Sequence, residues 1–237
     1  MKIFRDHDKL YLNENYKEIP KESTKFIVNN ALKFISSISN PTVLDVGCAT
    51  GDLIYYLQKK TPAANFTGMD VMEELLEKAR KENPKIQFLN GDIIQKKTLP
   101  DKKFDVIFCN GVLPIFDDIF TALDNILELL KENGRVFIFS IFNDEEFDVL
   151  VKVRKSSDHN GPWQSGWNLF SKKSILDYLE KKNFKHEFID WEMPIDLKKN
   201  PQDALRAWTF KDNEEKRLII NGTGILHSFS LLIIKTN

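Results

Sequence analysis

The stretch Val43–Asp52 joins an apolar run to a glycine-bearing turn, with a helical pattern directly after it. Gly47 and Gly51 allow the backbone to approach a ligand without an intervening side chain. Asp70 ends a second apolar run about twenty residues later, where a carboxylate can accept hydrogen bonds from both hydroxyls of a ribose. These residues predict a site for a nucleotide-like ligand at the start of a helix.

The residues of this turn favour a positively charged ligand over a phosphate. A dinucleotide-binding fingerprint would require glycine at positions 47, 49 and 52, where this sequence has Gly47, Ala49 and Asp52. Asp52 would bring a negative charge close to phosphates, which disfavours a nicotinamide-dependent oxidoreductase. The same acid suits a zwitterionic ligand such as S-adenosylmethionine, which carries an amino group and a sulfonium.

Apolar periodicity predicts the elements that position these residues. An amphipathic helix is expected over 21–38, and later helices carry apolar faces that begin near residues 53, 72 and 116. Gly134 is expected to cap the last of these helices. The strands are expected near 43–46, 66–70, 86–90, 104–110 and 136–141. Strict alternation of strand and helix predicts an α/β fold with a doubly wound parallel sheet.

The alternation is interrupted after residue 142. Ser171 is expected to cap a further helix, followed by strands near 184–191 and 226–234. The irregular stretches 143–170 and 193–224 are predicted to be lids or binding loops on the substrate side. The chain is thus predicted to be a single domain over 1–237, with an N-terminal cap helix region at 1–40 and a cofactor-binding core at 41–142.

Composition restricts the functional class. The 237 residues are 42% hydrophobic and 29% charged with a net charge of −1, which predicts a soluble globular domain and no nucleic-acid partner. No run approaches the ~20 apolar residues of a membrane span, and no signal peptide is visible. Two cysteines, Cys48 and Cys109, form no disulfide framework and favour a cytoplasmic location. No Cys/His spacing indicates a metal.

The motifs resemble those of class I S-adenosylmethionine-dependent methyltransferases, with the best agreement over residues 40–140. Four motifs carry the resemblance in the family's order: Val43–Asp52, Gly68–Asp70, Gly91–Asp92 and Phe104–Val112. Later segments are similar to a bacterial branch that methylates small molecules: Gly166–Ser171 and Asn221–Gly224. The resemblance implies a seven-stranded, mostly parallel, Rossmann-like sheet with an antiparallel last strand.

The resemblance also assigns residues to the methionine end of the cofactor. It implies that Asp45, Gly47 and Gly51 frame the methionine moiety, with Cys48 and Ala49 in the same turn. Most family members carry glycine where this chain has Ala49, whose methyl group is small enough to leave binding feasible.

The adenosine end is assigned in the same way. Asp70, with Val71 beside it, would bind the ribose hydroxyls, and Asp92 would accept a hydrogen bond from the adenine amino group next to a backbone donor at Ile93. Asn110 would lie near the methionine amino group or the transferred methyl. As isolated residues, Asp70 could instead be a helix cap and Asp92 a turn acid.

Aromatic and polar residues in the irregular segments predict the substrate side. Trp163 and Trp167, beside Asn168, could form a floor for a sugar ring or another flat polar substrate, or could simply pack. Arg206 could clamp a carboxylate or phosphate, or be a surface charge. Tyr16 could close over the cofactor or pack at a helix end.

The predicted activity is methyl transfer to a small molecule. The expected acceptor is a hydroxyl of a sugar, of a nucleotide-linked intermediate or of a small acid, and His159 is the candidate base. An ionised carboxylate acceptor would need no base. The alternatives are an N-methyltransferase acting on a small amine and a non-catalytic cofactor-binding module. A monomer or homodimer is expected.

Overall fold

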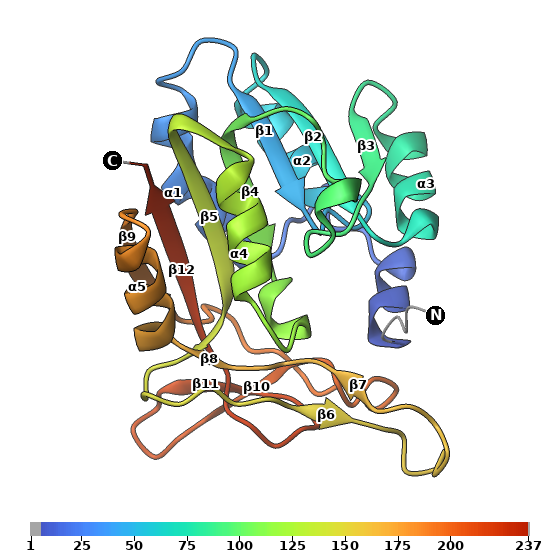
Figure 1. The fold of residues 1–237 in the computed structure, drawn as a ribbon. Helices are drawn as coiled ribbons and strands as arrows, with labels where there is room; N and C mark the ends of the chain where they lie inside the picture. Colours follow the sequence, from blue (N-terminus) through green and yellow to red (C-terminus); the bar gives the residue numbers. More distant parts are fainter. Residues whose placement is uncertain (1–5, 237) are drawn as a thin grey trace.

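A single mixed sheet runs through the computed structural model, which describes residues 6–236 (Figure 1). Its main strands lie in the order β3-β2-β1-β4-β5-β12-β9. Their bounds are β1 (Thr42–Val46), β2 (Asn65–Asp70), β3 (Gln87–Asn90), β4 (Phe104–Asn110), β5 (Leu130–Asn143), β9 (Lys185–Trp191) and β12 (Ser228–Lys235). β12 is antiparallel to both β5 and β9. The predicted seven-stranded, mostly parallel sheet is confirmed, and a two-residue strand, β8 (Phe170–Ser171), adds to β5.

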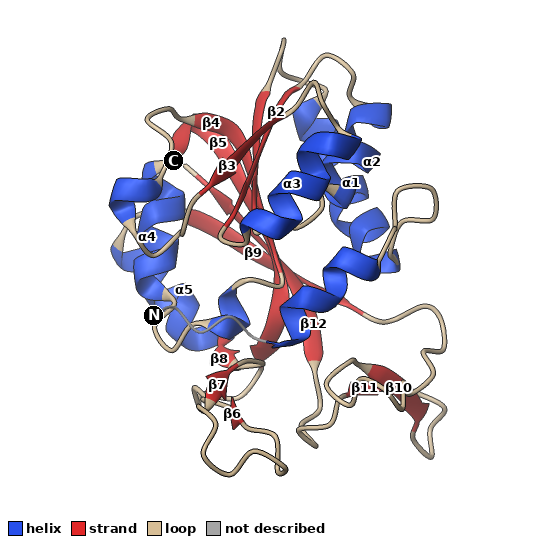
Figure 2. Cartoon of the chain, turned by 90° about the vertical axis from the view of Figure 1, so that its right-hand side faces the viewer, coloured by secondary structure: helices blue, strands red, loops and turns tan. Residues whose placement is uncertain are grey.

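Helices cover both faces of this sheet, as Figure 2 shows. The apolar sides of the first three helices pack on one face and those of the last two on the other. The helices are α1 (Glu22–Ile35), α2 (Asp52–Lys60), α3 (Glu73–Glu82), α4 (Phe120–Glu128) and α5 (Lys172–Lys181). Three short 3-10 helices accompany them: η1 (Asp6–Asn13), η2 (Lys96–Thr98) and η3 (Leu113–Ile115). The sheet is therefore doubly wound, as the alternation predicts.

The central strand β4 shows why the sequence requires two helical layers. Val106 and Phe108 point into the layer of α1 and α2, whereas Ile107 and Cys109 point into the layer of α4. All four side chains are fully buried. An apolar run without alternation can bury every side chain only when both faces of its strand are covered.

The helix expected around residues 116–130 is shorter than predicted, and the assignment of Gly134 as its cap is wrong. α4 ends at Glu128, and Gly134 lies inside β5. The pairing of β4 with β5 shifts register here, and a Cβ at position 134 would come within 3.0 Å of the Asp105 carbonyl oxygen. Gly134 is thus required for close backbone approach, while Asn133 takes the left-handed conformation at φ 62°.

The two inserts contain small antiparallel pairs and lie beyond the carboxyl end of β5 (Figure 1). β6 (Lys152–Val153) pairs with β7 (Gln164–Ser165), and β10 (Trp208–Lys211) pairs with β11 (Arg217–Ile220). The predicted cap of α5 is confirmed, since the Ser171 hydroxyl accepts the Lys173 N–H at 3.2 Å.

The division of the chain into cap, core and insert regions stays a prediction. Residues 1–5 of the predicted N-terminal region lie outside the described residues. Among residues 6–236, the structure has no helix that is both long enough and apolar enough to cross a membrane.

Candidate active site

The glycine turn after β1 is held by the neighbouring strand β2. The N–H groups of Gly47 and Cys48 both donate to the Met69 carbonyl, at 2.8 and 3.1 Å. Gly47 has φ 72°, and a Cβ on it would lie 2.3 Å from Cγ2 of Val112. Only glycine fits this position. Cys48 is buried and its thiol pKa is raised by burial, so its side chain packs while its backbone shapes the turn.

Asp70 ties this turn to the start of α3. One carboxylate oxygen accepts the Ala49 N–H and the other accepts the Met72 N–H, each at 2.9 Å. The Asp70 carboxylate therefore holds the residues just before α3, whose N-cap is Met72, and Val71 donates a further backbone hydrogen bond to it. Since a carboxylate has about four acceptor sites, these three N–H groups leave capacity for about one further donor, such as a ribose hydroxyl. Burial raises the pKa of Asp70.

Two further carboxylates flank the turn. Asp45, on β1, is 3% exposed, and burial together with the nearby Asp70 raises its pKa well above the usual range. Asp52 begins α2, where its Oδ2 accepts the Tyr16 N–H at 3.3 Å. Its Oδ1 is buried with no hydrogen-bond partner among the described residues. An orphaned carboxylate oxygen beside the turn fits the amino group of a zwitterionic cofactor.

Asp92 and Ile93 are placed beyond the end of β3 but are already engaged within the protein. The Asp92 carboxylate accepts from Gln95 Nε2 at 2.7 Å and from the Ile94 N–H at 3.3 Å. The Ile93 side chain is core, and its carbonyl accepts from Asn125 at 2.6 Å. An adenine amino group would have to share Asp92 with Gln95, so the adenine role stays a prediction.

Asn110 ends β4 next to the turn. The register of β1 on β4 pairs Val46 with Cys109, so Gly47 and Asn110 follow on adjacent strand ends. On its other side Asn110 pairs with Phe139 of β5. Asn110 is half-buried at this carboxyl edge, which is where open α/β sheets bind ligands.

The segment before α1 lies against the turn and against α3. The Lys78 ammonium on α3 donates to the Glu14 carbonyl at 3.0 Å, and the Tyr16 N–H reaches Asp52. The Lys21 ammonium lies 4.3 Å from the centroid of the Tyr16 ring. Tyr16 thus lies beside the glycine turn, and its contact with a ligand stays a prediction.

Both inserts meet this N-terminal segment. Arg206 bonds to the Glu14 carboxylate through Nη2 and to Asp203 through Nε at 3.2 Å. The Trp167 ring makes an edge contact with His7, with centroids 5.3 Å apart. Trp167 has φ 60°, an uncommon conformation for a bulky residue that its packing here must hold. The structure therefore brings Tyr16, Trp167 and Arg206 to one region.

Asn168 holds an insert in place. Its side chain is fully buried, its Oδ1 accepts the Val151 N–H at 2.7 Å, and its Nδ2 donates to the Phe116 carbonyl at 2.7 Å. A weaker contact reaches Asp117 at 3.3 Å. The amide is thus occupied by the protein, and its predicted role as a substrate contact has no support in this geometry.

Trp163 and His159 lie away from this region, on the loop that joins β6 to β7. Trp163 is 59% exposed and stacks under the Arg154 guanidinium at 4.7 Å, while the His159 carbonyl accepts from the same arginine. The His159 residue is exposed. Trp163 thus contacts Arg154 whereas Trp167 contacts His7, and both the aromatic floor and the role of His159 as a base stay predictions.

Sequence reasoning missed several residues that shape the site. Glu14, Lys21 and Lys78 resemble ordinary surface charges in the sequence, yet they fasten the N-terminal segment.

His227 directly precedes β12 and is 5% exposed. Its Nε2 is buried and has no hydrogen-bond partner among the described residues. Burial lowers its pKa to about 4. His227 lies at the carboxyl edge of the sheet, because the next residue, Ser228, pairs with Phe142 near the end of β5.

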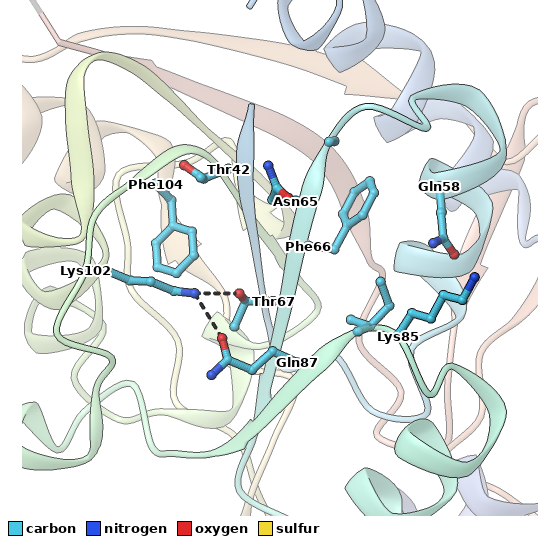
Figure 3. A pocket seen from close by; sticks show the side chains of 11 residues that line it. Thr42, Gln58, Asn65, Phe66, Thr67, Lys85, Gln87, Lys102 and Phe104 are labelled. Carbon is cyan, nitrogen blue, oxygen red and sulfur yellow. Dashed lines mark hydrogen bonds between the residues drawn. The ribbon is translucent and has the colours of Figure 1, made fainter. Parts of the chain in front are cut away.

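A hollow of about 300 Å³ lies elsewhere, at the amino ends of the strands (Figure 3). Thr42, Asn65 and Phe104 line it. The Lys102 ammonium donates to Thr67 Oγ1 at 3.1 Å and to Gln87 Oε1 at 3.0 Å. It is at the opposite end of β1 from the glycine turn and belongs to no predicted site. Among residues 6–236 no group of three or more His, Cys, Asp or Glu could hold a metal ion.

Comparison with known proteins agrees with this geometry. The family described as "Methyltransferase domain" matches residues 38–190. Trans-aconitate 2-methyltransferase of Enterobacter sp. (strain 638) is 34% identical over 46% of this chain and 43% of its own length. Malonyl-[acyl-carrier protein] O-methyltransferase of Halalkalibacterium halodurans is 31% identical over 60% of this chain and 52% of its own. The match spans about half the length of these two curated relatives.

A solved structure extends the likeness to nearly the whole chain. N-methyltransferase NodS from Bradyrhizobium japonicum WM9, in complex with S-adenosyl-L-homocysteine, superposes with a TM-score of 0.54 at 18% identity and covers 98% of this chain and 93% of its own. At that identity the likeness concerns the fold. The family match, the strand order and the carboxylates around the glycine turn together show that the chain belongs to the class I S-adenosylmethionine-dependent methyltransferases.

Proposed function

We propose that this protein transfers a methyl group from S-adenosylmethionine to an oxygen of a small acid. The observation that supports the donor site most directly is the buried Oδ1 of Asp52, which has no hydrogen-bond partner among residues 6–236 and directly follows the glycine turn that Asp70 holds through the Ala49 N–H. Asp52 and the turn around Gly47 would hold the methionine moiety, while Asp70 would hold the ribose. When bound, the donor supplies an electrophilic methyl on a good leaving group.

The protein's contribution would be positioning and exclusion of water. Holding the acceptor, the methyl carbon and the sulfur in line can supply up to ~7–11 kcal/mol of the barrier. The segment around Tyr16, whose N–H donates to Asp52, and the insert around Trp167, whose ring contacts His7 of the same segment, would exclude water from the donor site.

Two observations favour an acid among the predicted acceptors. A carboxylate is already ionised at neutral pH and needs no general base, which suits a site where the candidate base His159 is exposed on an outer loop. Two relatives are named for trans-aconitate and for malonyl-[acyl-carrier protein], both of which are carboxylic acids. Hydroxyl groups of sugars and of nucleotide-linked intermediates are the other predicted acceptors, and the turnover assay with labelled donor would test them as well.

The second candidate is methylation of a small amine, since the similar structure NodS is named an N-methyltransferase. The third is a cofactor-binding module without turnover. The retention of Asp45 and Asp70 favours an enzyme over such a module.

The test combines donor binding with turnover. Calorimetry with S-adenosylhomocysteine should show a 1:1 complex, and labelled donor should yield a methyl ester with a panel of small carboxylic acids. Product from amines alone would support the second candidate, and binding without product across acids, sugars and amines would support the module. If neither S-adenosylmethionine nor S-adenosylhomocysteine bound, the proposal would be refuted. Light scattering of the same sample would test the predicted monomer or homodimer.

A further inference from the structure

Two cations beside the cofactor turn converge on one carboxylate of the protein itself. Lys21 Nζ lies 3.1 Å from Glu14 Oε2, and Arg206 Nη2 bonds to Glu14 Oε1. Lys21 precedes α1, whereas Arg206 belongs to the second insert, so the Glu14 side chain joins parts of the chain that are 192 residues apart. The Glu14 side chain is 13% exposed.

This cluster adjoins the residues that would hold the donor. Lys21 is close enough to Asp52 and Arg206 for both to influence its pKa, which burial lowers. Tyr16 is likewise influenced by Glu14, Arg206 and Asp52. The geometry agrees, because the Lys21 ammonium lies 4.3 Å from the centroid of the Tyr16 ring and the Tyr16 N–H donates to Asp52 at 3.3 Å.

The arrangement lets the Glu14 side chain leave without undoing the segment. The Glu14 carbonyl accepts from Lys78 on α3, and its N–H donates to the Tyr11 carbonyl at 3.3 Å. Arg206 keeps its bond from Nε to Asp203, which leaves its outer nitrogens directed at whatever replaces Glu14. A guanidinium and an ammonium that share one carboxylate would serve any ligand carboxylate equally well.

We propose that Lys21 and Arg206 form a subsite for a ligand carboxylate, and that Glu14 is a tethered competitor that fills this subsite until the ligand displaces it. The inference rests on the proposed function. The carboxylate could come from the methionine part of the donor or from an acidic acceptor. In either case Glu14 lowers the apparent affinity: if it occupies the subsite nine-tenths of the time, the dissociation constant rises about tenfold.

The test is Glu14→Gln, which removes the competing charge at nearly constant shape. Glu18→Gln is the matched control, because Glu18 belongs to the same segment but contacts Tyr55 and Lys59 instead. Calorimetry would compare S-adenosylhomocysteine with 5′-methylthioadenosine, which has the same thioether and adenosine but no amino acid. Malonate would be titrated as an acidic probe, with and without saturating S-adenosylhomocysteine.

We expect Glu14→Gln to tighten a carboxylate ligand about tenfold while 5′-methylthioadenosine binds unchanged. Tighter S-adenosylhomocysteine would identify the carboxylate of the donor, and tighter malonate on the saturated protein would identify that of the acceptor. Lys21→Met should weaken the same ligand. The proposal is overturned if Glu14→Gln matches Glu18→Gln for every probe, or if it shifts 5′-methylthioadenosine as much as S-adenosylhomocysteine. Failure of both nucleosides to bind would refute the proposed function instead, and malonate on the protein alone would still report on the subsite.

Discussion

Replacing Asp70 by alanine tests the donor site and the turn in one experiment. The Asp70 carboxylate has two structural duties, since it accepts the N–H groups of Ala49 and Met72, and one proposed duty toward the ribose. Asp70→Ala should therefore lower both donor affinity and stability, by amounts that can be estimated separately.

The two magnitudes follow from the hydrogen bonds that are lost. A ribose hydroxyl that donates to an ionised Asp70 carboxylate should contribute ~1–3 kcal/mol to binding, which is a five- to 150-fold change in the dissociation constant. Loss of the two backbone partners should cost about 2 kcal/mol of unfolding free energy, close to the loss of a strong helix cap. The raised pKa of Asp70 shows that burying this carboxylate already costs free energy, which offsets part of the loss.

Calorimetry with S-adenosylhomocysteine and urea unfolding would measure the two effects. Asp118→Ala is the matched control, because Asp118 accepts the Phe120 N–H at 2.9 Å at the start of α4, on the opposite face of the sheet. That variant should lose about 1 kcal/mol of stability and no donor affinity. Unchanged donor affinity in a folded Asp70→Ala protein would remove Asp70 from the site and contradict the reasoning.

Three further changes test how the structure is held. Ala49→Gly should raise the unfolding free energy by up to ~1 kcal/mol in urea titrations, because φ 46° strains alanine and not glycine; a destabilised variant would contradict this. Asn168→Ala should cost about 3 kcal/mol, because the Val151 N–H and the Phe116 carbonyl lose their buried partner, and hydrogen exchange should increase in residues 143–170. His227 has a pKa lowered to about 4 from 6.5, so the folded state binds fewer protons than the unfolded state in that window and stability rises with pH. Between pH 5 and 7 the gain from His227 should be about 2 kcal/mol, and His227→Gln should lose this pH dependence.

Local pattern was enough to predict most of the sheet. β4 spans Phe104–Asn110, the same residues that the apolar run predicts, because the run from 106 to 109 has no alternation and is buried on both faces of the sheet. Position also predicted that Asp70 ends a strand, and the structure confirms this and joins its carboxylate to the glycine turn, while its contact with the ribose stays a prediction. These features depend on residues close together in the sequence.

The remainder depends on contacts between distant parts of the chain. Gly134 was predicted to cap a helix, but the pairing of β5 with β4 draws it into a strand. Asn168 has the residue type of a ligand contact, yet two backbone groups from other segments occupy its amide. The ion pair of Glu14 with Arg206 joins residues that are 192 positions apart, and periodicity in the sequence cannot predict such a contact.

The charges around the turn explain why a sulfonium suits this fold better than a phosphate. Asp45, Asp52 and Asp70 gather negative charge in a partly dry region, and the raised pKa of each shows that ionisation there is costly. A ligand with positive charge relieves that cost, whereas a dinucleotide would add to it. S-adenosylmethionine loses its sulfonium charge once the methyl has gone, so in the proposed site the field of these carboxylates would favour the donor over its product. Ionising these three carboxylates costs free energy in the protein alone. Their charge would thereby promote both binding of the donor and release of the product.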